Sequence, residues 1–216
     1  MSKPRVLLAD DHTLVLEGFK KLLEEHCQVV GSVEDGRSLL EAAKRLRPDI
    51  VVLDISMPQL NGLDAARRLR KIVPHARLVF VTVHADPDYV NQAFKAGASA
   101  YLLKRSAGSE LSQAIEAVRN GNYYVTSLIA KDLVQSAISD TEPSTGGQNR
   151  LPMRQREILQ LVAEGLTLKE IASTLGLSPK TVEYHKSKLM EQLGLHTTAE
   201  LTKYALAHGL TPSSSE

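Results

Sequence analysis

The sequence is short of the residues that build covalent, aromatic or membrane-embedded sites. Its single cysteine, Cys27, excludes an internal disulfide framework and a zinc site made of cysteines, and it is typical of a reducing compartment. Tryptophan is absent and aromatic residues make up only 4% of the 216 residues, which argues against a binding site of stacked rings. The longest apolar runs, such as residues 78–83, are far shorter than the roughly 20 residues that cross a bilayer. We therefore expect a cytoplasmic protein with no signal peptide and no membrane partner.

The remaining composition is that of ordinary globular domains. Apolar residues make up 43% of the chain and charged residues 24%, which is enough apolar surface for well-packed cores. The length suits two domains better than one. The formal net charge of +1 does not by itself point to a nucleic-acid partner.

The first 120 residues alternate short apolar runs with segments of helical period. The runs are rich in Val, Ile and Leu and show little polar alternation, which is typical of parallel strands covered on both faces. Five such runs are separated by five helical segments, so this part of the chain predicts a small doubly wound α/β domain. The expected strands are 5–9, 28–33, 50–53, 78–83 and 100–103, and the helical segments between and after them are 13–25, 37–46, 63–72, 86–95 and 111–118.

A polar stretch then separates this domain from a helical one. Residues 139–149 are rich in Gly, Ser and Thr and read as a flexible linker, with a helix over 127–138 leading into it. Capping boxes begin at Thr167 and Thr197, and Ser178 followed by proline marks a third helix start. With the helix that ends near Gly165, these signals predict four helices. The expected domains are 1–122, a helix and linker over 123–149, a helical domain over 150–211 and a disordered tail over 212–216.

Carboxylates follow two of the expected strands at the point where each strand ends. Asp10 and Asp11 come directly after the first strand and Asp54 after the third, while Thr82 and Lys104 lie at the ends of the fourth and fifth. In an open parallel sheet, ligands bind beyond the carboxyl ends of the strands. Clustered carboxylates suit a hard divalent cation such as Mg²⁺, and a hydroxyl with an ammonium group suits a phosphoryl group. A single Asp there is commonly only a turn or cap residue, but the joint occurrence predicts a pocket.

The residues around these positions resemble the receiver domain of two-component response regulators. The match covers roughly residues 4–120. It implies a flavodoxin-like fold of five parallel strands in which Asp54 accepts a phosphoryl group from a sensor histidine kinase. The motifs that carry it are Asp10-Asp11, Asp54-x-x-Met57-Pro58-x-x-x-Gly62, Thr82 and Tyr101-x-x-Lys104.

The resemblance also implies a role for each site residue. Asp10, Asp11, Asp54 and the backbone carbonyl of Ser56 would hold Mg²⁺. Lys104 would pair with the phosphoryl oxygens, and Thr82 and Tyr101 would form the switch pair. The chemistry supports these roles, because a carboxylate nucleophile and an incoming phosphoryl group are both negative and their charge must be offset.

A few positions depart from the common receiver pattern. Many receivers have proline after the lysine, whereas this chain has Arg105. Ser56 and His84 lie two residues beyond Asp54 and Thr82, at positions that influence how long the acyl phosphate survives in the family. A family of Mg²⁺ phosphatases with an aspartate nucleophile uses Asp-x-Asp, so Ser56 counts against that alternative.

The helical tail alone is compatible with dimerisation or partner binding as well as with DNA binding. Its third helix has apolar residues on one side and cationic and polar residues on the rest, a surface able to meet phosphates and base edges. The candidate DNA-contact residues are Lys169, Lys180, Thr181, Glu183, Tyr184, His185, Lys186 and Lys188.

The tail further resembles the LuxR-type helix-turn-helix over residues 150–210. The resemblance implies that the helix over 179–193 enters the major groove and that the last helix forms a dimer contact on DNA. Glu183 departs from the lysine often found there, which predicts a different sequence preference. The motifs that carry the match are Arg154-x-x-Glu157-Ile-Leu, Gly165, Lys169-Glu170-Ile171-Ala172, Leu175, Leu177-Ser178, Thr181-Val182-x-x-His185 and Leu193-Gly194.

Together the two parts resemble a response regulator of the NarL/FixJ class. The expected function is a switch in sequence-specific DNA binding, and hence in transcription, controlled by phosphorylation of Asp54. The expected partners are a sensor histidine kinase, promoter DNA, a second copy of the chain on DNA, and RNA polymerase. We expect no enzyme activity beyond the receiver's own Mg²⁺-dependent phosphoryl transfer and autodephosphorylation. A Mg²⁺ phosphatase fused to a helical domain and a phosphorylation-independent DNA binder stay open as alternatives, as do relief of inhibition and dimerisation as the means of control.

Overall fold

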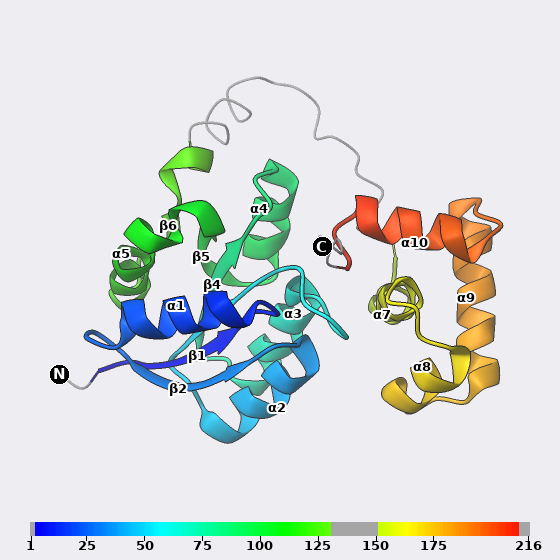
Figure 1. The fold of residues 1–216 in the computed structure, drawn as a ribbon, viewed down its shortest axis with the longest axis horizontal. Helices are drawn as coiled ribbons and strands as arrows, with labels where there is room; N and C mark the ends of the chain where they lie inside the picture. The colour runs from blue at the N-terminus through cyan, green and yellow to red at the C-terminus, as the bar shows by residue number, and fades with distance from the viewer. Residues whose placement is uncertain (1–2, 131–150, 212–216) are drawn as a thin grey trace. The chain divides into compact units, whose positions relative to one another are not determined.

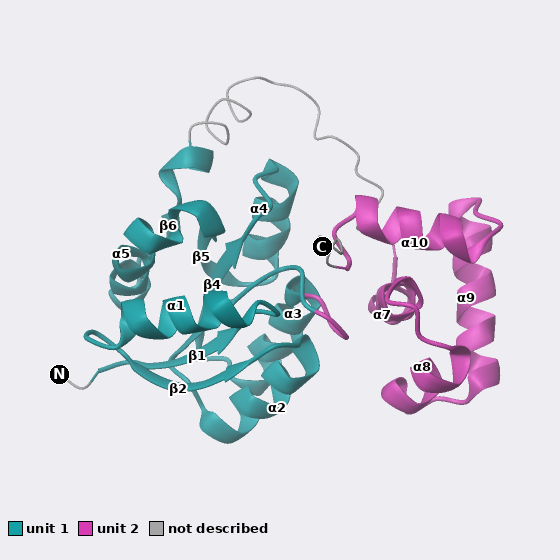
Figure 2. Cartoon of the chain, in the orientation of Figure 1, with its two compact units in different colours: residues 1–57, 62–144 teal, residues 58–61, 145–216 magenta. Residues whose placement is uncertain are grey.

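The computed structural model describes residues 3–130 and 151–211. The predicted linker, the tail and most of the helix expected over 127–138 lie outside these residues. The chain divides into two compact units, one of residues 1–57 and 62–144 and the other of residues 58–61 and 145–216 (Figure 2). The finer domain boundaries that the sequence suggested stay a prediction. Within the described residues, no helix combines the length and apolar character needed to span a membrane.

A parallel sheet forms the centre of the first unit (Figure 1). Over residues 3–130 this sheet has six strands, in the order β2-β1-β3-β4-β5-β6. The five predicted strands are confirmed, but the expectation of five in total is wrong, because β6 adds a sixth. This strand has only two residues, too few for a hydrophobic pattern to be visible in the sequence. The strands are β1 Arg5–Ala9, β2 Gln28–Val33, β3 Ile50–Leu53, β4 Arg77–Thr82, β5 Ala98–Leu103 and β6 Tyr124–Val125.

Helices cover both faces of this sheet because its central strands are apolar on both sides. All four residues of β3 and all six of β5 are buried. The apolar stripes of α1 and α5 share one core with side chains from β1, β3, β4 and β5, so these two helices lie on the same face. A short 3₁₀ helix, η1 Lys104–Ser106, precedes α5. The helices are α1 Thr13–Leu23, α2 Gly36–Leu46, α3 Gly62–Ile72, α4 Pro87–Lys95 and α5 Ala107–Arg119.

The strand order determines where a ligand would bind. The chain passes from β1 outward to β2 and then back to β3 on the other side of β1, so the connections on the two sides of β1 run in opposite directions. In doubly wound sheets the crevice at such a point, beyond the carboxyl ends of the strands, is the ligand site. The residues that follow β1 and β3 are Asp10 and Asp54, which therefore lie beside this crevice.

The described part of the second unit, residues 151–211, contains the four predicted helices around one core. They are α7 Met153–Ala163, α8 Leu168–Leu175, α9 Pro179–Leu193 and α10 Thr198–Ala207. Fully buried side chains from all four meet in this core, for example Ile158, Ile171, Leu189 and Leu201. The turn between α8 and α9 passes through Gly176, whose φ of 64° lies in the left-handed region that glycine adopts at low cost.

The start of α8 offers a direct test of the capping chemistry. The Thr167 side chain accepts a hydrogen bond from Glu170 N, and the Glu170 carboxylate accepts one from Thr167 N at 2.7 Å, so the predicted capping box is formed. We expect Thr167→Ala to lower the free energy of unfolding by about 1 kcal/mol, because it leaves an N-terminal amide without its cap. Thermal unfolding measures this loss.

Thr174, in the last turn of the same helix, provides the matched control. Its hydroxyl donates to the Glu170 carbonyl oxygen at 2.8 Å and caps no N-terminal amide. Thr174→Ala should change the free energy of unfolding by less than about 0.5 kcal/mol, since alanine favours helix and the lost bond duplicates a backbone interaction. Equal losses from both substitutions would contradict the capping explanation.

Candidate functional site

Two carboxylates and one ammonium group meet at the carboxyl end of the sheet. The Lys104 Nζ lies 2.7 Å from Asp10 Oδ2 and 2.8 Å from Asp54 Oδ2. Asp10 follows β1, Asp54 follows β3 and Lys104 begins η1 after β5, so three separate strand ends supply this cluster. Both carboxylates are almost completely buried, and the Lys104 side chain is 14% exposed. The three residues that the sequence placed together are together in the structure.

Burial and charge act against each other in this cluster. Burial raises the pKa of Asp10, the Lys104 ammonium opposes the rise, and the neighbouring Asp54 carboxylate adds to it. Burial alone would lower the pKa of Lys104, but the carboxylates of Asp54 and Asp10 outweigh it, and the pKa of Lys104 is raised. The ammonium therefore stays charged and lies directly beside the Asp54 oxygen.

Asp11 and His12 form a second cluster of polar side chains with Asp10. The His12 Nδ1 lies 2.7 Å from Asp11 Oδ1 and 3.1 Å from Asp10 Oδ1, and potential ligand atoms of these three residues all lie within 4.8 Å of one another. Asp10 Oδ2 and Asp11 Oδ1 are buried oxygens, the first paired with the Lys104 ammonium and the second with the His12 ring. Oxygens of this kind fit a hard divalent cation, so the acidic cluster could bind a metal ion.

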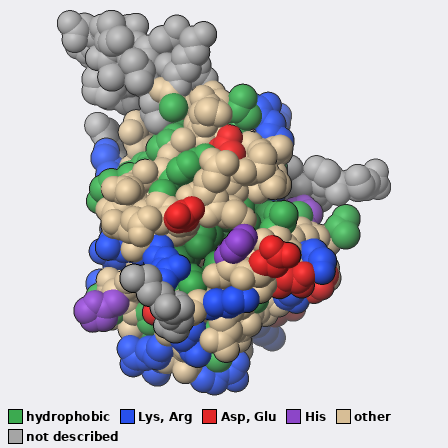
Figure 3. Space-filling model, turned by 90° about the vertical axis from the view of Figure 1, so that its left-hand side faces the viewer, with side chains coloured by type: hydrophobic (Ala, Val, Ile, Leu, Met, Phe, Trp, Pro, Cys, Tyr) green, Lys and Arg blue, Asp and Glu red, His purple; other side chains and the backbone are tan. Residues whose placement is uncertain are grey.

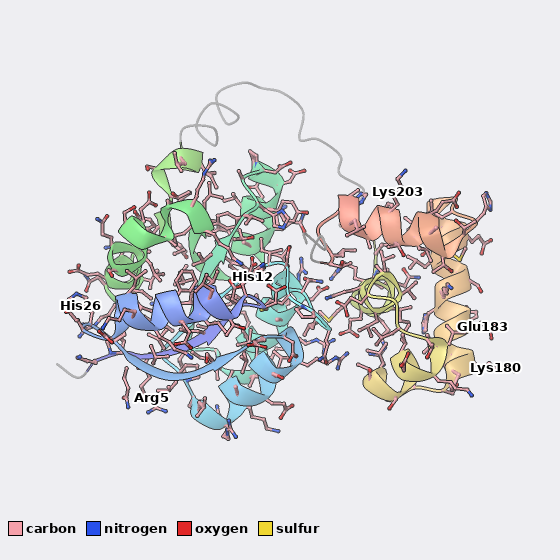
Figure 4. All side chains as sticks on the ribbon, viewed as in Figure 1. Arg5, His12, His26, Lys180, Glu183 and Lys203 are labelled. Atoms are coloured by element: carbon pink, nitrogen blue, oxygen red, sulfur yellow. The ribbon has the colours of Figure 1, made fainter. Side chains whose placement is uncertain are left out.

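His12 was not among the residues that the sequence singled out. It lies between the aspartate pair and the first turn of α1 (Figure 4), and its backbone N donates to Asp10 Oδ1 at 2.9 Å. Its place directly after the two aspartates was the only available signal. The bond orients the Asp10 carboxylate and leaves its Oδ2 turned towards Lys104.

The loop after β3 holds Asp54 through backbone contacts. Asp54 N donates to Ala9 O at 3.0 Å, which ties β3 to the end of β1. Gly62 N donates to Ile55 O at 2.7 Å and brings the start of α3 against the Asp54 backbone. A Cβ at residue 62 would lie 1.9 Å from Asp54 O, so only glycine fits this contact.

A histidine joins the Asp54 loop to the end of β4. The His84 Nε2 lies 2.9 Å from Ser56 Oγ, and the His84 ring stacks on Tyr89 with 4.2 Å between ring centroids. Burial lowers the pKa of His84, with the Lys104 charge acting in the same direction and Asp54 against it, so the ring is neutral near pH 7. The metal-binding role expected for the Ser56 carbonyl stays a prediction.

The two residues of the expected switch pair are both fully buried. Thr82 ends β4, and its Oγ1 lies 3.5 Å from His84 N. The Tyr101 hydroxyl donates to His84 O at 2.9 Å, and its ring stacks on Phe80. His84 therefore contacts both residues of the pair. The Tyr101 side chain therefore lies inside the first unit, beside the backbone of His84.

The expected DNA-contact residues lie mainly on the solvent side of α9. Val182 and Leu189 are fully buried, whereas Glu183, Tyr184 and Lys188 are exposed, so the helix presents a polar face (Figure 4). Lys169 and Lys180 are exposed as well, and Thr181, His185 and Lys186 are half-buried. Lysine and arginine side chains gather elsewhere too, for example along the lower part of the face drawn in Figure 3. Positive charge alone therefore does not single out α9.

Comparison with known proteins gives both units a family. Residues 6–116 match the family described as "Response regulator receiver domain" and residues 149–205 the family described as "Bacterial regulatory proteins, luxR family". The transcriptional regulatory protein MctR of Rhizobium johnstonii is 38% identical, with 96% of this chain and 95% of that protein covered. The response regulator UvrY of Escherichia coli K12 is 33% identical, with 95% and 94% covered.

Solved structures of the response regulator RcsB share the fold over nearly the whole chain. One from Salmonella typhimurium has a TM-score of 0.66 at 27% identity and covers 98% of this chain and 100% of its own. The RcsB–DNA complex has a TM-score of 0.59 at 26% identity, with 95% and 99% covered. With two family matches and relatives that align over nearly their whole length, this chain belongs to the two-component response regulators that join a receiver domain to a LuxR-type DNA-binding domain.

Proposed function

We propose that Asp54 is the phosphoacceptor of this response regulator and that a sensor histidine kinase is the donor. The observation that carries the proposal is the half-buried Lys104 ammonium, 2.8 Å from Asp54 Oδ2 and also paired with Asp10. Asp54 Oδ1 accepts a hydrogen bond from Ile55 N, which orients the carboxylate with Oδ2 towards Lys104. A carboxylate oriented beside a fixed cation is suited to nucleophilic attack on a phosphoryl group.

The transfer forms one bond and breaks one. An Asp54 oxygen attacks phosphorus, and the bond between phosphorus and the donor nitrogen of the kinase histidine breaks, with its electron pair staying on that nitrogen. Negative charge then accumulates on the phosphoryl oxygens, and the Lys104 ammonium is positioned to pair with them as it separates from Asp54. No external substrate is turned over, so the protein acts as a switch rather than as an enzyme.

The clustered carboxylate oxygens of Asp10 and Asp11 fit a magnesium ion. These two residues would hold it together with Asp54 and the Ser56 carbonyl, as the family resemblance implies. When bound, Mg²⁺ would offset the negative charge that Lys104 alone leaves unpaired. Within this set, His12 contributes by orienting both aspartates.

In the second unit we assign DNA binding to α9, with the partner duplex entered through its major groove. The exposed Lys180 and Lys188 would contact phosphates, and Thr181, Glu183, Tyr184, His185 and Lys186 would lie towards base edges or the backbone, with Lys169 on the preceding helix. A solved structure described as two RcsB dimers bound to two parallel DNAs supports a homodimer on DNA. We assign the dimer contact to α10, as the family resemblance implies. The proposal includes a cytoplasmic location, and RNA polymerase as a further partner.

Phosphorylation would act through the residues around His84. Drawing the Thr82 hydroxyl towards a phosphoryl group on Asp54 would disturb its contact with His84 N, and the Tyr101 hydroxyl depends on the same residue for its acceptor. The surface around β4 and β5 would change as a consequence. Both release of the DNA-binding unit and dimerisation are compatible with this step.

Incubation with acetyl phosphate and Mg²⁺, followed by intact mass spectrometry, tests the proposal. We expect one phosphoryl group per chain, and gel shifts of the same samples on genomic fragments should show a change in DNA affinity. Repeated hydrolysis of the donor without a retained phosphoryl group would favour a phosphatase. A retained phosphoryl group without any change in DNA affinity would favour a DNA binder that does not depend on phosphorylation.

His84→Ala is expected to shorten the lifetime of the acyl phosphate by about threefold or more. The ring fills space beside the pocket, through its contacts with Ser56 and Tyr89, and its removal admits water to Asp54. Decay of the phosphoprotein, followed by intact mass, measures the effect. Tyr89→Phe keeps the stacked ring and should decay like the unmodified chain. Identical decay of the His84 variant would remove this role.

Lys180→Ala and Lys188→Ala are expected to weaken DNA binding by a similar factor on every sequence. Each loss of a phosphate contact should make the slope of log K against log salt shallower by about 0.9. Fluorescence anisotropy over a salt series measures both affinity and slope. Lys71→Ala, which removes an exposed lysine from α3, is the control and should leave the slope unchanged. An unchanged slope in both α9 variants would contradict the assignment.

A further inference from the structure

Lys104 is held in a turn that lacks the proline found in many receivers. It is the first residue of η1, and Arg105 follows it. The Ser106 hydroxyl donates to Leu103 O at 3.1 Å, and the Ala107 amide donates to Lys104 O, so Ser106 closes the turn from which the Lys104 side chain leaves. The precise direction of Lys104 therefore depends on Ser106 rather than on a fixed ring.

Ser106 is in turn bonded to a residue from a distant part of the chain. Its Oγ lies 3.0 Å from Thr126 Oγ1, and both residues are buried, with Thr126 fully so. Thr126 N also donates to Tyr101 O at 2.9 Å, which extends the pairing of β6 with β5. One side chain thus contacts the Lys104 turn while its own backbone is bonded to the strand that carries Tyr101.

Thr126 also begins the last described segment of the first unit. Ile129 N and Ala130 N both donate to Thr126 O, which starts a helical turn, and Ile129 is 1% exposed. The Ser127 hydroxyl donates to Glu110 Oε1 at 3.3 Å, so residues 124–130 are attached to α5 as well. Because β6 has only two residues, the bond between Thr126 and Ser106 is a substantial part of this attachment.

We propose that Ser106 and Thr126, here called the hydroxyl pair, are positioning residues that hold Lys104 at the pocket and tie segment 124–130 to it. Neither touches the reacting atoms. A buried hydrogen bond of this kind fixes the η1 turn, and through it the direction of the ammonium group towards Asp54. Loss of the hydroxyl pair would leave the Lys104 ammonium group charged, but its direction towards the Asp54 carboxylate would be less well fixed.

The proposal rests on the proposed phosphoryl transfer to Asp54, and its test begins from the rate of that reaction. With acetyl phosphate and saturating Mg²⁺, the full chain carrying Thr126→Val should be phosphorylated about threefold to tenfold more slowly, the cost of about one hydrogen bond. Valine matches threonine in shape, so packing is kept. Ser106→Ala should slow the reaction to a similar degree, and Thr126→Ser, which restores the hydroxyl, should recover most of the rate.

A Lys104→Ala background separates positioning from general stability. If the hydroxyl pair acts through Lys104, Thr126→Val should have no additional effect on the rate once Lys104 is gone. The same slowing in both backgrounds, or an unchanged rate in Thr126→Val, would overturn the proposal. Thermal unfolding checks each variant, and if Thr126→Val does not fold, Ser106→Ala and Thr126→Ser provide the same comparison. A chain that takes up no phosphoryl group at all would instead overturn the proposed function.

Discussion

Asp54→Ala is expected to abolish both phosphorylation and the response of DNA binding to the phosphoryl donor. The substitution removes the nucleophile, and Lys104 keeps only Asp10 as its partner among the pairs formed at this site. Asp54 lies at the end of the central strand β3, and its Oδ2 is 2.8 Å from the Lys104 ammonium. This position suits it to accept a phosphoryl group. DNA affinity should then be the same with and without acetyl phosphate. Intact mass and gel shifts on one set of samples measure the two effects together.

Asp49→Asn is the matched control for this variant. Asp49 precedes β3, at the opposite end of the strand from Asp54, and its carboxylate accepts a hydrogen bond from Arg5 N at 2.8 Å. Asparagine can accept the same bond, so phosphorylation and the DNA response should both persist. An Asp54→Ala chain that still gained one phosphoryl group under these conditions would show that another residue is the acceptor.

Gly62→Ala is expected to have the largest effect on stability among the substitutions considered. The added Cβ would lie 1.9 Å from Asp54 O and 3.0 Å from Ile55 Cα, and both are backbone atoms that cannot rotate away. The start of α3 would have to move, which breaks the 2.7 Å bond from Gly62 N to Ile55 O. We expect a loss of about 3 kcal/mol or more in the free energy of unfolding, since overpacking against backbone is hard to relieve. Denaturant unfolding measures it.

The same substitution should also slow phosphorylation, because the displaced backbone carries Asp54. Gly18→Ala provides the comparison for stability. Gly18 lies in α1, and a Cβ added there would meet no atom within 4 Å beyond its own helix backbone, so alanine should be neutral or stabilise the helix by about 0.5–1 kcal/mol. If the two alanine variants unfolded at the same denaturant concentration, the prediction that a Cβ at residue 62 destabilises the protein by its contact with Asp54 O would be contradicted.

The parts of the fold that depend on local chemistry were visible in the sequence. Parallel strands buried on both faces, such as β3, read as continuous apolar runs. The side chains of Thr167, Ser178 and Thr197 each accept a hydrogen bond at the helix start where the sequence placed them. Strand β6 escaped prediction because two paired residues leave no periodic signal, and its position depends on contacts with β5 that are distant in sequence.

The candidate site was predictable to the extent that topology determines it. Parallel strands place their carboxyl ends at one edge of the sheet. The sequence alone therefore predicts that Asp10, Asp54 and Lys104 lie close together. Two contacts could not be predicted from the sequence: the one between Ser56 and His84 and the one between Ser106 and Thr126. Their side-chain hydrogen bonds cross 28 and 20 residues of sequence and depend on packing that no short motif encodes. These unpredicted contacts surround the pocket and are the ones through which we expect it to be tuned.

Locating the phosphoryl group on the chain tests the central claim most directly. The full protein is treated with acetyl phosphate and Mg²⁺, digested, and its peptides are analysed by mass spectrometry under conditions that preserve or trap the acyl phosphate. The pocket formed by Asp10, Asp54 and Lys104 predicts a single modified peptide, with the group on Asp54 and none formed when a chelator removes the metal. A phosphoryl group on any other residue, or none on a folded chain with Mg²⁺ present, would contradict the account.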